Sequence, residues 1–337
     1  FGCQNNTLCT SKLQLALDYC SLTAKTINDN TSNTYLMSEA GTTNFCLLIG
    51  SSSEIQGNFT LKLDDGTNNL TASIRVIAGA TNVTLKDFTA DFNRDNQTGA
   101  SGNGIVGSDN NNNVLYSGLT LKNAQNRTIV TNNDAIVGSV IPHPDSANNI
   151  KVENCNILNA GDKGFMVRKT KNSSVTNCYH EGNITDMGNA SGSCFESSQS
   201  YNIVFDSCNG RNEGLPSLGP GIRTVNGSRY IKYTNCIVFG GRQGFFIADS
   251  SDIKYSNCSA IDSGFTGVLI GSTGANASAY ALMRNITIEN CDIINCGQSI
   301  VDAGVVCSIA DPVGELNTVK IENNFIFSDD GGMTQGI

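Results

Sequence analysis

Short stretches of alternating hydrophobic and polar residues fill the second half of the chain. One such stretch recurs, and it ends each time in Asn-Cys or Ser-Cys. Its copies end at Cys155, Cys178, Cys208, Cys236, Cys258 and Cys291. The intervals between these cysteines are 23, 30, 28, 22 and 33 residues. A short repeat with insertions of varied length is typical of a solenoid with loops on one side.

A second alternating segment follows within the units, and it opens with glycine and a large apolar residue. Examples are Gly164-Phe-Met-Val, Gly244-Phe-Phe-Ile and Gly267-Val-Leu-Ile. Helical spacing is absent, and the units are too short for a strand plus a crossover helix. The pattern therefore predicts an all-β chain, a parallel β-helix whose coils stack about 4.8 Å apart.

The amino end has a different pattern, and it predicts a cap. Residues Lys12 to Tyr19 are expected to form a short capping helix with Thr10 or Ser11 as its N-cap. We therefore divide the chain into a cap, residues 1–45, and a parallel β-helix, residues 46–337. The last residues, Gly336-Ile337, look like the start of another strand, so we expect further coils, or a partner, at this end.

The recurrent cysteines are expected to stack as small buried thiols beside the asparagine bends. Parallel neighbours point the same way, which makes disulfides between successive coils awkward. Cys3, Cys9, Cys20 and Cys46 lie outside the column, and they could form one or two disulfides. No Cys-X-X-Cys pair or histidine partner favours a metal site, and no cofactor is predicted.

The residues resemble the pectin-lyase-like β-helix superfamily. Phe1-Gly2 followed by the segment Leu13 to Tyr19 is similar to the usual entry of that superfamily. The segment Leu85 to Asn96 resembles an early coil of mannuronan C5-epimerases and of several phage tailspikes. The resemblance implies a right-handed parallel β-helix that handles carbohydrate. It does not imply one reaction, since this fold hosts lyases, epimerases, hydrolases and adhesins.

The epimerase motif is retained only in part. The family carries Asp-Pro-His, whereas this chain has Ile141-Pro142-His143. The next carboxylate of the family falls near Arg168 and its second histidine near Ser193. By resemblance, His143 alone keeps a catalytic position.

Counting back from the bends places Met166, Glu196, Arg223 and Phe246 in one outward column of the glycine-phenylalanine strands. Arg168, Ser198 and Asp249 or its neighbour fall in the next column. We predict that Arg168, Arg223, Lys169 and Asp249 bind substrate, because arginine neutralises a sugar carboxylate by a bidentate pair. His143 and Glu196 are the predicted catalytic residues, with Lys169 as another candidate base.

Two alternatives stay open at this point. A hydrolase would need a second carboxylate about 5–9 Å from Glu196, and Asp162, Asp186 and Asp206 are candidates by position. Otherwise the same residues form a solvated face with ordinary ion pairs. His180 is expected on a surface turn.

Composition narrows the function further. The net charge is −9 and no basic stripe exists, which argues against a nucleic-acid binder. The chain contains no run of 18 apolar residues, so no membrane span is predicted. Fourteen Asn-X-Ser/Thr sequons suggest a secretory route, whereas reduced cysteines suggest a reducing compartment. We expect an extracellular protein, secreted or on a virion surface.

The sequence leaves three functions open. The first is a polysaccharide lyase or epimerase acting on an acidic polysaccharide. The second is a viral tailspike or adhesin that binds surface glycans. The third is a structural β-helix glycoprotein of a filament or coat, and a homo-oligomer fits all three.

Overall fold

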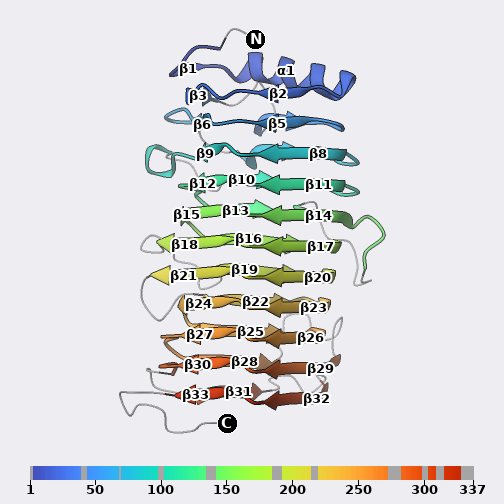
Figure 1. Cartoon of the computed structure of the whole chain (residues 1–337), viewed down its shortest axis with the longest axis vertical. Helices are drawn as coiled ribbons and strands as arrows, with labels where there is room; N and C mark the ends of the chain where they lie inside the picture. The colour runs from blue at the N-terminus through green and yellow to red at the C-terminus, as the bar shows by residue number, and fades with distance from the viewer. Residues whose placement is uncertain are drawn as a thin grey trace.

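The protein is a tall stack of coils with one helix at its amino end (Figure 1). The computed structural model describes residues 3–38, 44–67, 70–97, 102–133, 142–183, 192–213, 219–271, 282–297, 303–308 and 315–327. Each strand pairs in parallel with the strand three places along the chain, except at the cap, where β1 pairs with β3. This arrangement confirms the predicted all-β solenoid with an amino-terminal helix.

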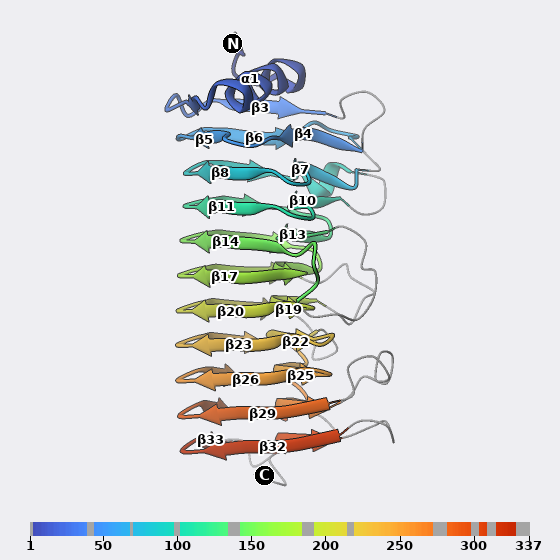
Figure 2. The same ribbon diagram turned by 90° about the vertical axis from the view of Figure 1, so that its right-hand side faces the viewer.

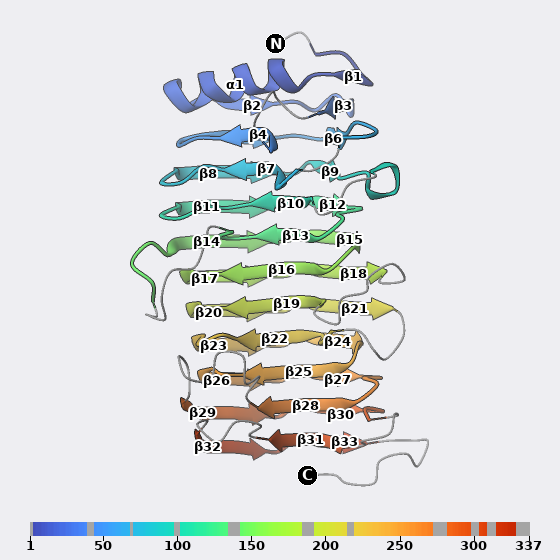
Figure 3. The same ribbon diagram turned by 180° about the vertical axis from the view of Figure 1, so that it is seen from behind.

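Three parallel sheets form the walls, and Figures 2 and 3 show them from two further sides. The twelve-stranded sheet contains β1 (Thr7–Leu8), β3 (Thr34–Met37), β6 (Thr60–Leu63), β9 (Thr89–Asp91), β12 (Thr120–Lys122), β15 (Asn156–Ala160), β18 (Tyr179–Asn183), β21 (Asn209–Glu213), β24 (Ile237–Gly240), β27 (Ser259–Ile261), β30 (Asp292–Ile294) and β33 (Phe325–Phe327). The ten-stranded sheet contains β4 (Phe45–Ile49), β7 (Ala72–Val76), β10 (Asn103–Val106), β13 (Arg127–Val130), β16 (Lys163–Arg168), β19 (Ser193–Ser198), β22 (Ile222–Val225), β25 (Gln243–Ala248), β28 (Thr266–Gly271) and β31 (Ala303–Ser308). The eleven-stranded sheet contains β2 (Thr26–Asn28), β5 (Glu54–Gln56), β8 (Thr81–Lys86), β11 (Asn112–Ser117), β14 (Ala147–Glu153), β17 (Thr170–Thr176), β20 (Tyr201–Asp206), β23 (Arg229–Thr234), β26 (Ser251–Ser256), β29 (Leu282–Glu289) and β32 (Glu315–Glu322). Besides the strands there are α1 (Thr10–Thr23) and a short 3-10 helix, η1 (Arg94–Asn96).

Stacked apolar columns fill the space between the three sheets. On the ten-stranded sheet, Phe165 pairs with Phe195, and Ile222 pairs with Phe245 in the coils below. These four side chains are at most 1% exposed, and the rings of Phe165 and Phe195 stack with centroids 5.3 Å apart. The predicted inward positions of Phe165 and Phe245 are therefore confirmed.

The predicted cysteine column is also confirmed. The backbone carbonyl of Cys155 accepts a hydrogen bond from Tyr179, the residue after Cys178, and the same contact repeats in each following coil. All six thiols are at most 1% exposed, and none forms a disulfide. The bend residue before each cysteine, such as Asn154 with φ 54°, has a left-handed backbone, which asparagine adopts at little cost.

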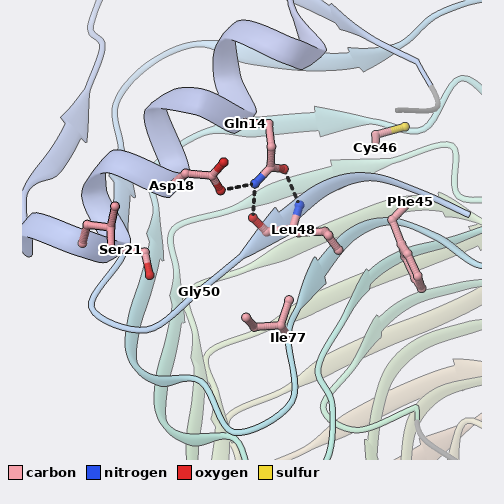
Figure 4. A pocket seen from close by; sticks show the side chains of 9 residues that line it. Gln14, Asp18, Ser21, Phe45, Cys46, Leu48, Gly50 and Ile77 are labelled. Atoms are coloured by element: carbon pink, nitrogen blue, oxygen red, sulfur yellow. Dashed lines mark hydrogen bonds between the residues drawn. The ribbon is translucent and has the colours of Figure 1, made fainter. Parts of the chain in front are cut away.

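Helix α1 closes the amino end of the core. The amide of Gln14 bonds to both the backbone N–H and the carbonyl of Leu48, at 2.8 and 2.9 Å, as a neighbouring strand would (Figure 4). This contact satisfies the edge of β4, which is the terminal strand of its sheet. A hollow of about 550 Å³ lies beside it, lined by Asp18, Leu22 and Ile77 among others.

Two predictions about the cap were wrong. The N-cap of α1 is Cys9, not Thr10 or Ser11. The Thr10 hydroxyl is not available as a cap, because it accepts a hydrogen bond from the backbone N–H of Ser38 at 2.8 Å. Cys3, Cys9, Cys20 and Cys46 also form no disulfide.

The prediction for His180 was wrong as well. Its side chain is 1% exposed and points into the core, because it pairs with Ile157 on β15 and its ring lies against Gly164 of β16 and Gly182 of its own strand. The division of the chain at residue 45 stays a prediction, and Gly336-Ile337 lies outside the described residues.

Candidate functional site

The outer face of the ten-stranded sheet carries the predicted columns. Met166 pairs with Glu196, which pairs with Arg223, which pairs with Phe246. This register confirms the first predicted column. In the coils just above Glu196, Val106, Val130 and Met166 form a small apolar cluster, and Arg75 precedes Val106 in the same column.

In the second column, Arg168 pairs with Ser198, and Ser198 pairs with Val225. Asp249 is not part of this column, because β25 ends at Ala248 and Asp249 forms the corner after it with φ 49°. Its side chain is only 2% exposed. The sequence analysis gave Asp249 or its neighbour for this position, and it is the neighbour, Ala248, that lies on the strand.

Glu196 is at the centre of a buried ionic cluster. Its carboxylate Oε2 lies 2.7 Å from the ammonium of Lys163 and 3.2 Å from the Arg223 guanidinium. The Ser193 hydroxyl donates to the same oxygen at 3.2 Å. Glu196 is 1% exposed and Lys163 is 5% exposed, so this carboxylate is enclosed by its partners.

Two opposing effects set the pKa of Glu196. Burial disfavours the charged carboxylate, but the nearby charges and hydrogen bonds of Lys163 and Arg223 outweigh burial, so the pKa lies below its ordinary value. The group is therefore ionised at neutral pH. A general acid needs the opposite shift, so this environment fits a charge-holding role for Glu196 better than proton donation.

Two arginines from the coils above Glu196 converge on the side chain of Asn133. The guanidiniums of Arg127 and Arg168 both donate to the side-chain oxygen of Asn133, at 3.1 and 3.4 Å. The Thr131 hydroxyl accepts from the backbone N–H of Arg168 at 3.1 Å. Both arginines are half-buried, so each guanidinium is held by the protein while part of it faces solvent.

Lys169 does not face the outer surface. It occupies the corner between the ten-stranded and eleven-stranded sheets with φ 47°, and its side chain is 1% exposed. Its ammonium lies 2.6 Å from the carboxylate of Asp109, which also accepts from the Asn132 amide at 2.9 Å. These contacts hold Lys169 inside the corner, away from the outer face on which it was predicted to bind substrate.

His143 lies just before β14, at the same corner. The backbone N–H of Asp145 donates to its Nδ1 at 3.3 Å, and the Asp145 carboxylate lies 3.9 Å from that nitrogen. His143 lies in the connection before β14 of the eleven-stranded sheet, whereas Glu196 lies on β19 of the ten-stranded sheet, so the two predicted catalytic residues come from different parts of the solenoid.

The additional carboxylates proposed for a hydrolase are also distributed. Asp206 lies on β20 of the eleven-stranded sheet, on another wall from Glu196. Asp162 is nearly buried in the turn before β16, and Asp186 lies outside the described residues. Asp206 is therefore excluded as the partner of Glu196.

Charge distinguishes the ten-stranded sheet from the other two. Its strands carry five cationic residues and one acidic residue, Glu196. The five are Arg75, Arg127, Lys163, Arg168 and Arg223. The whole chain has a net charge of −9, so this face is a local cationic strip on an acidic protein.

The sequence analysis missed three of these cations, Arg75, Arg127 and Lys163. Arg127 and Lys163 pair in register with each other, but the next residue in their column is Ser193. Arg75 lies in another column, between Leu48 and Val106, so neither column repeats a cation from coil to coil throughout. These cations stand out only when the charged residues of each sheet are counted. That count requires the strand boundaries, which come from the structure.

Within the described residues, no group of three metal-binding side chains occurs, and no helix is long and apolar enough to cross a bilayer.

Residues 143–281 match a family model described as right handed beta helix region. The fold is that of a right-handed parallel β-helix. A search of curated proteins finds no match.

Solved structures share this β-helix along the whole chain. The A-module of mannuronan C-5 epimerase AlgE4 from Azotobacter vinelandii is 16% identical, with a TM-score of 0.65, and the alignment covers 100% of this chain and 96% of that one. A tailspike double mutant of E. coli bacteriophage HK620 is 14% identical, with a TM-score of 0.68, covering 99% of this chain and 62% of the tailspike. A tailspike mutant in complex with pentasaccharide is 13% identical, with a TM-score of 0.69 and the same coverage. At these identities the likeness establishes the fold alone.

Proposed function

We propose that the protein binds an acidic polysaccharide along the outer face of the ten-stranded sheet. The observation that carries this proposal is the excess of five cationic residues over one acidic residue on that sheet, in a chain of net charge −9. A local cationic strip attracts a polyanion that the rest of the surface repels.

The spacing of the arginines supports a linear ligand. Arg168 and Arg223 lie two coils apart, which corresponds to roughly 10 Å along the solenoid. This is about the length of two sugar residues in an extended chain. A guanidinium binds a carboxylate by two parallel hydrogen bonds, so successive uronate residues offer matching partners.

The neighbours in fold support the same class of ligand. One is named as an epimerase of mannuronan, and another is described in complex with a pentasaccharide. Extracellular or virion-surface location belongs to this proposal, because surface polysaccharides are found there.

Turnover by lyase or epimerase chemistry is the first form of the proposal. The arginines would neutralise the sugar carboxylate and acidify the adjacent C–H, and a base would then remove that proton. His143 is the candidate base. Glu196 would hold Arg223 and Lys163 in place, since its carboxylate is ionised and enclosed.

A glycan adhesin without turnover is the second form. The burial of Glu196 favours it, because its carboxylate contacts three protein donors and is 1% exposed.

Incubation with alginate and pectate distinguishes the two forms. A lyase produces the ultraviolet absorbance of an unsaturated uronate, and an epimerase changes the ratio of epimers seen by NMR. His143→Asn should abolish either signal and leave binding intact. Binding without product in the parent protein supports the adhesin, and absence of binding to every acidic polymer overturns the proposal.

A further inference from the structure

A column of exposed polar side chains runs along the eleven-stranded sheet, with one residue in each coil. We call this column the ladder and each of its residues a rung. Its residues have a left-handed backbone, and their amides link successive coils. The Asn149 amide donates to Asn113 at 3.2 Å, and the Asn202 amide donates to Asn172 at 2.9 Å. Asparagine suits this position because its short polar side chain tolerates a positive φ.

Tyr230 interrupts this ladder. It follows Asn202 in the stack, has φ 56°, and is 51% exposed. Within the part of the chain that the structure describes, it is the only aromatic residue with a positive φ. A bulky side chain rarely adopts this backbone, and an exposed ring is not compensated by burial. Strain of this kind is concentrated at functional sites.

The surroundings of Tyr230 form a small patch. Its ring lies against that of Tyr201 at a centroid distance of 5.1 Å and an interplanar angle of 70°. In the adjacent column, Lys171 pairs with Tyr201, which pairs with Arg229. The described residues include no ion-pair partner for Lys171 or Arg229.

The acid on the next rung of the ladder forms no ion pair with these cations. Asp252 occupies the rung below Tyr230, and its two oxygens accept from the Asn285 amide at 2.7 Å and from the Ser251 hydroxyl at 3.2 Å. The patch therefore combines two aromatic rings with cations above and below them.

We propose that Lys171, Tyr201, Arg229 and Tyr230 form a subsite for an acidic sugar residue of a polysaccharide. The exposed Tyr230 ring would pack against the apolar C–H face of a pyranose, and the two cations would bind its carboxylate. The two cations lie one coil above and one coil below Tyr201, about 5 Å on either side of it along the solenoid, so both long side chains can approach one carboxylate held between them.

This subsite lies around a corner from the ten-stranded sheet. Lys171 follows Arg168 by three residues, with the Lys169 corner between them. The class of ligand rests on the proposed function, but the subsite is on a different wall. A polysaccharide bound at both places would bend over this corner.

The test uses isothermal titration calorimetry with hexamers of mannuronate and galacturonate, and with cellohexaose as the neutral probe. Tyr230→Asn restores the residue type of the ladder, so the melting temperature should stay equal or rise. Affinity for the acidic hexamer should fall by about tenfold. Thr318→Asn, which makes the same kind of change at a ladder residue with φ 56° far from the two rings, is the matched control and should keep parent affinity.

A second variant keeps the rings in place. The double change Lys171→Gln and Arg229→Gln should weaken the acidic hexamer and leave any binding of cellohexaose unchanged. If both variants bind the acidic hexamer as the parent does, while Arg168→Ala does not, the subsite is overturned and the proposed function stands. If the parent binds neither acidic hexamer, both proposals fail.

Discussion

The carboxylate of Glu196 lies 2.7 Å from the ammonium of Lys163, and both side chains are buried on the outer face of the ten-stranded sheet. Removing one member of such a pair leaves an uncompensated buried charge. Glu196→Met removes the partner of the buried Lys163 ammonium, and it should therefore lower the free energy of unfolding by about 3–5 kcal/mol, measured by urea denaturation.

The double variant Lys163→Met and Glu196→Met tests the reason for that loss. It removes both charges together, so its cost should be clearly smaller than the sum of the two single costs. Additive costs would show that the two side chains act independently, contrary to the contact between them.

The buried His180 predicts a specific pH dependence of stability. Burial lowers its pKa from the ordinary value of 6.5 to about 3. Below about pH 6.5 the unfolded chain binds a proton that the folded protein does not, so stability falls by about 1.4 kcal/mol per pH unit until the folded pKa is reached.

Urea midpoints measured between neutral pH and pH 4 check this dependence. His180→Leu removes the titrating group, so its stability should depend less steeply on pH than that of the parent. Equal slopes for the parent and His180→Leu would mean that His180 reaches solvent in the folded state.

Stacked phenylalanines should dominate the stability of the core. Phe165→Ala and Phe245→Ala should each cost about 3–5 kcal/mol in free energy of unfolding, because both side chains are at most 1% exposed. Phe239→Ala, whose ring is 40% exposed on the outside of β24, should cost much less. A cost below about 1 kcal/mol for the two core variants would contradict their inward orientation.

The cysteine column should be chemically silent in the folded protein. Its six thiols are sealed between coils, and each of them donates to the carbonyl two residues earlier, as Cys178 does to Thr176 at 3.2 Å. Iodoacetamide treatment of the native protein, followed by peptide mass spectrometry, should leave Cys178 and Cys236 unmodified. Modification of these residues before unfolding would contradict a closed core.

The sequence predicted those features that repeat from coil to coil. The period of Cys155 to Cys291 sets the register, and that register correctly placed Met166, Glu196, Arg223 and Phe246 in one column. Periodicity works here because a stacked strand repeats the environment of the strand before it.

Features that occur once were not predictable in this way. The inward position of His180 depends on Gly164 and Gly182 leaving space for its ring, and a single histidine has no column to reveal it. The N-cap of α1 depends on Ser38, a residue 28 positions from Thr10 that bonds to the Thr10 hydroxyl. Lys163 was missed because its ion pair with Glu196 connects two coils, and the next residue in its column is Ser193 and not another cation.

The dependence of polysaccharide affinity on Arg168 and Arg223 tests the proposed function most directly. Calorimetric titration with oligomannuronate and oligogalacturonate, at low and high salt, should give binding that weakens with salt, since the contacts are ionic. Arg168→Ala and Arg223→Ala should each reduce affinity about tenfold or more, whereas Lys232→Ala, an exposed cation on β23 of the eleven-stranded sheet, should not. Parent-like affinity in both arginine variants would contradict binding along the ten-stranded sheet.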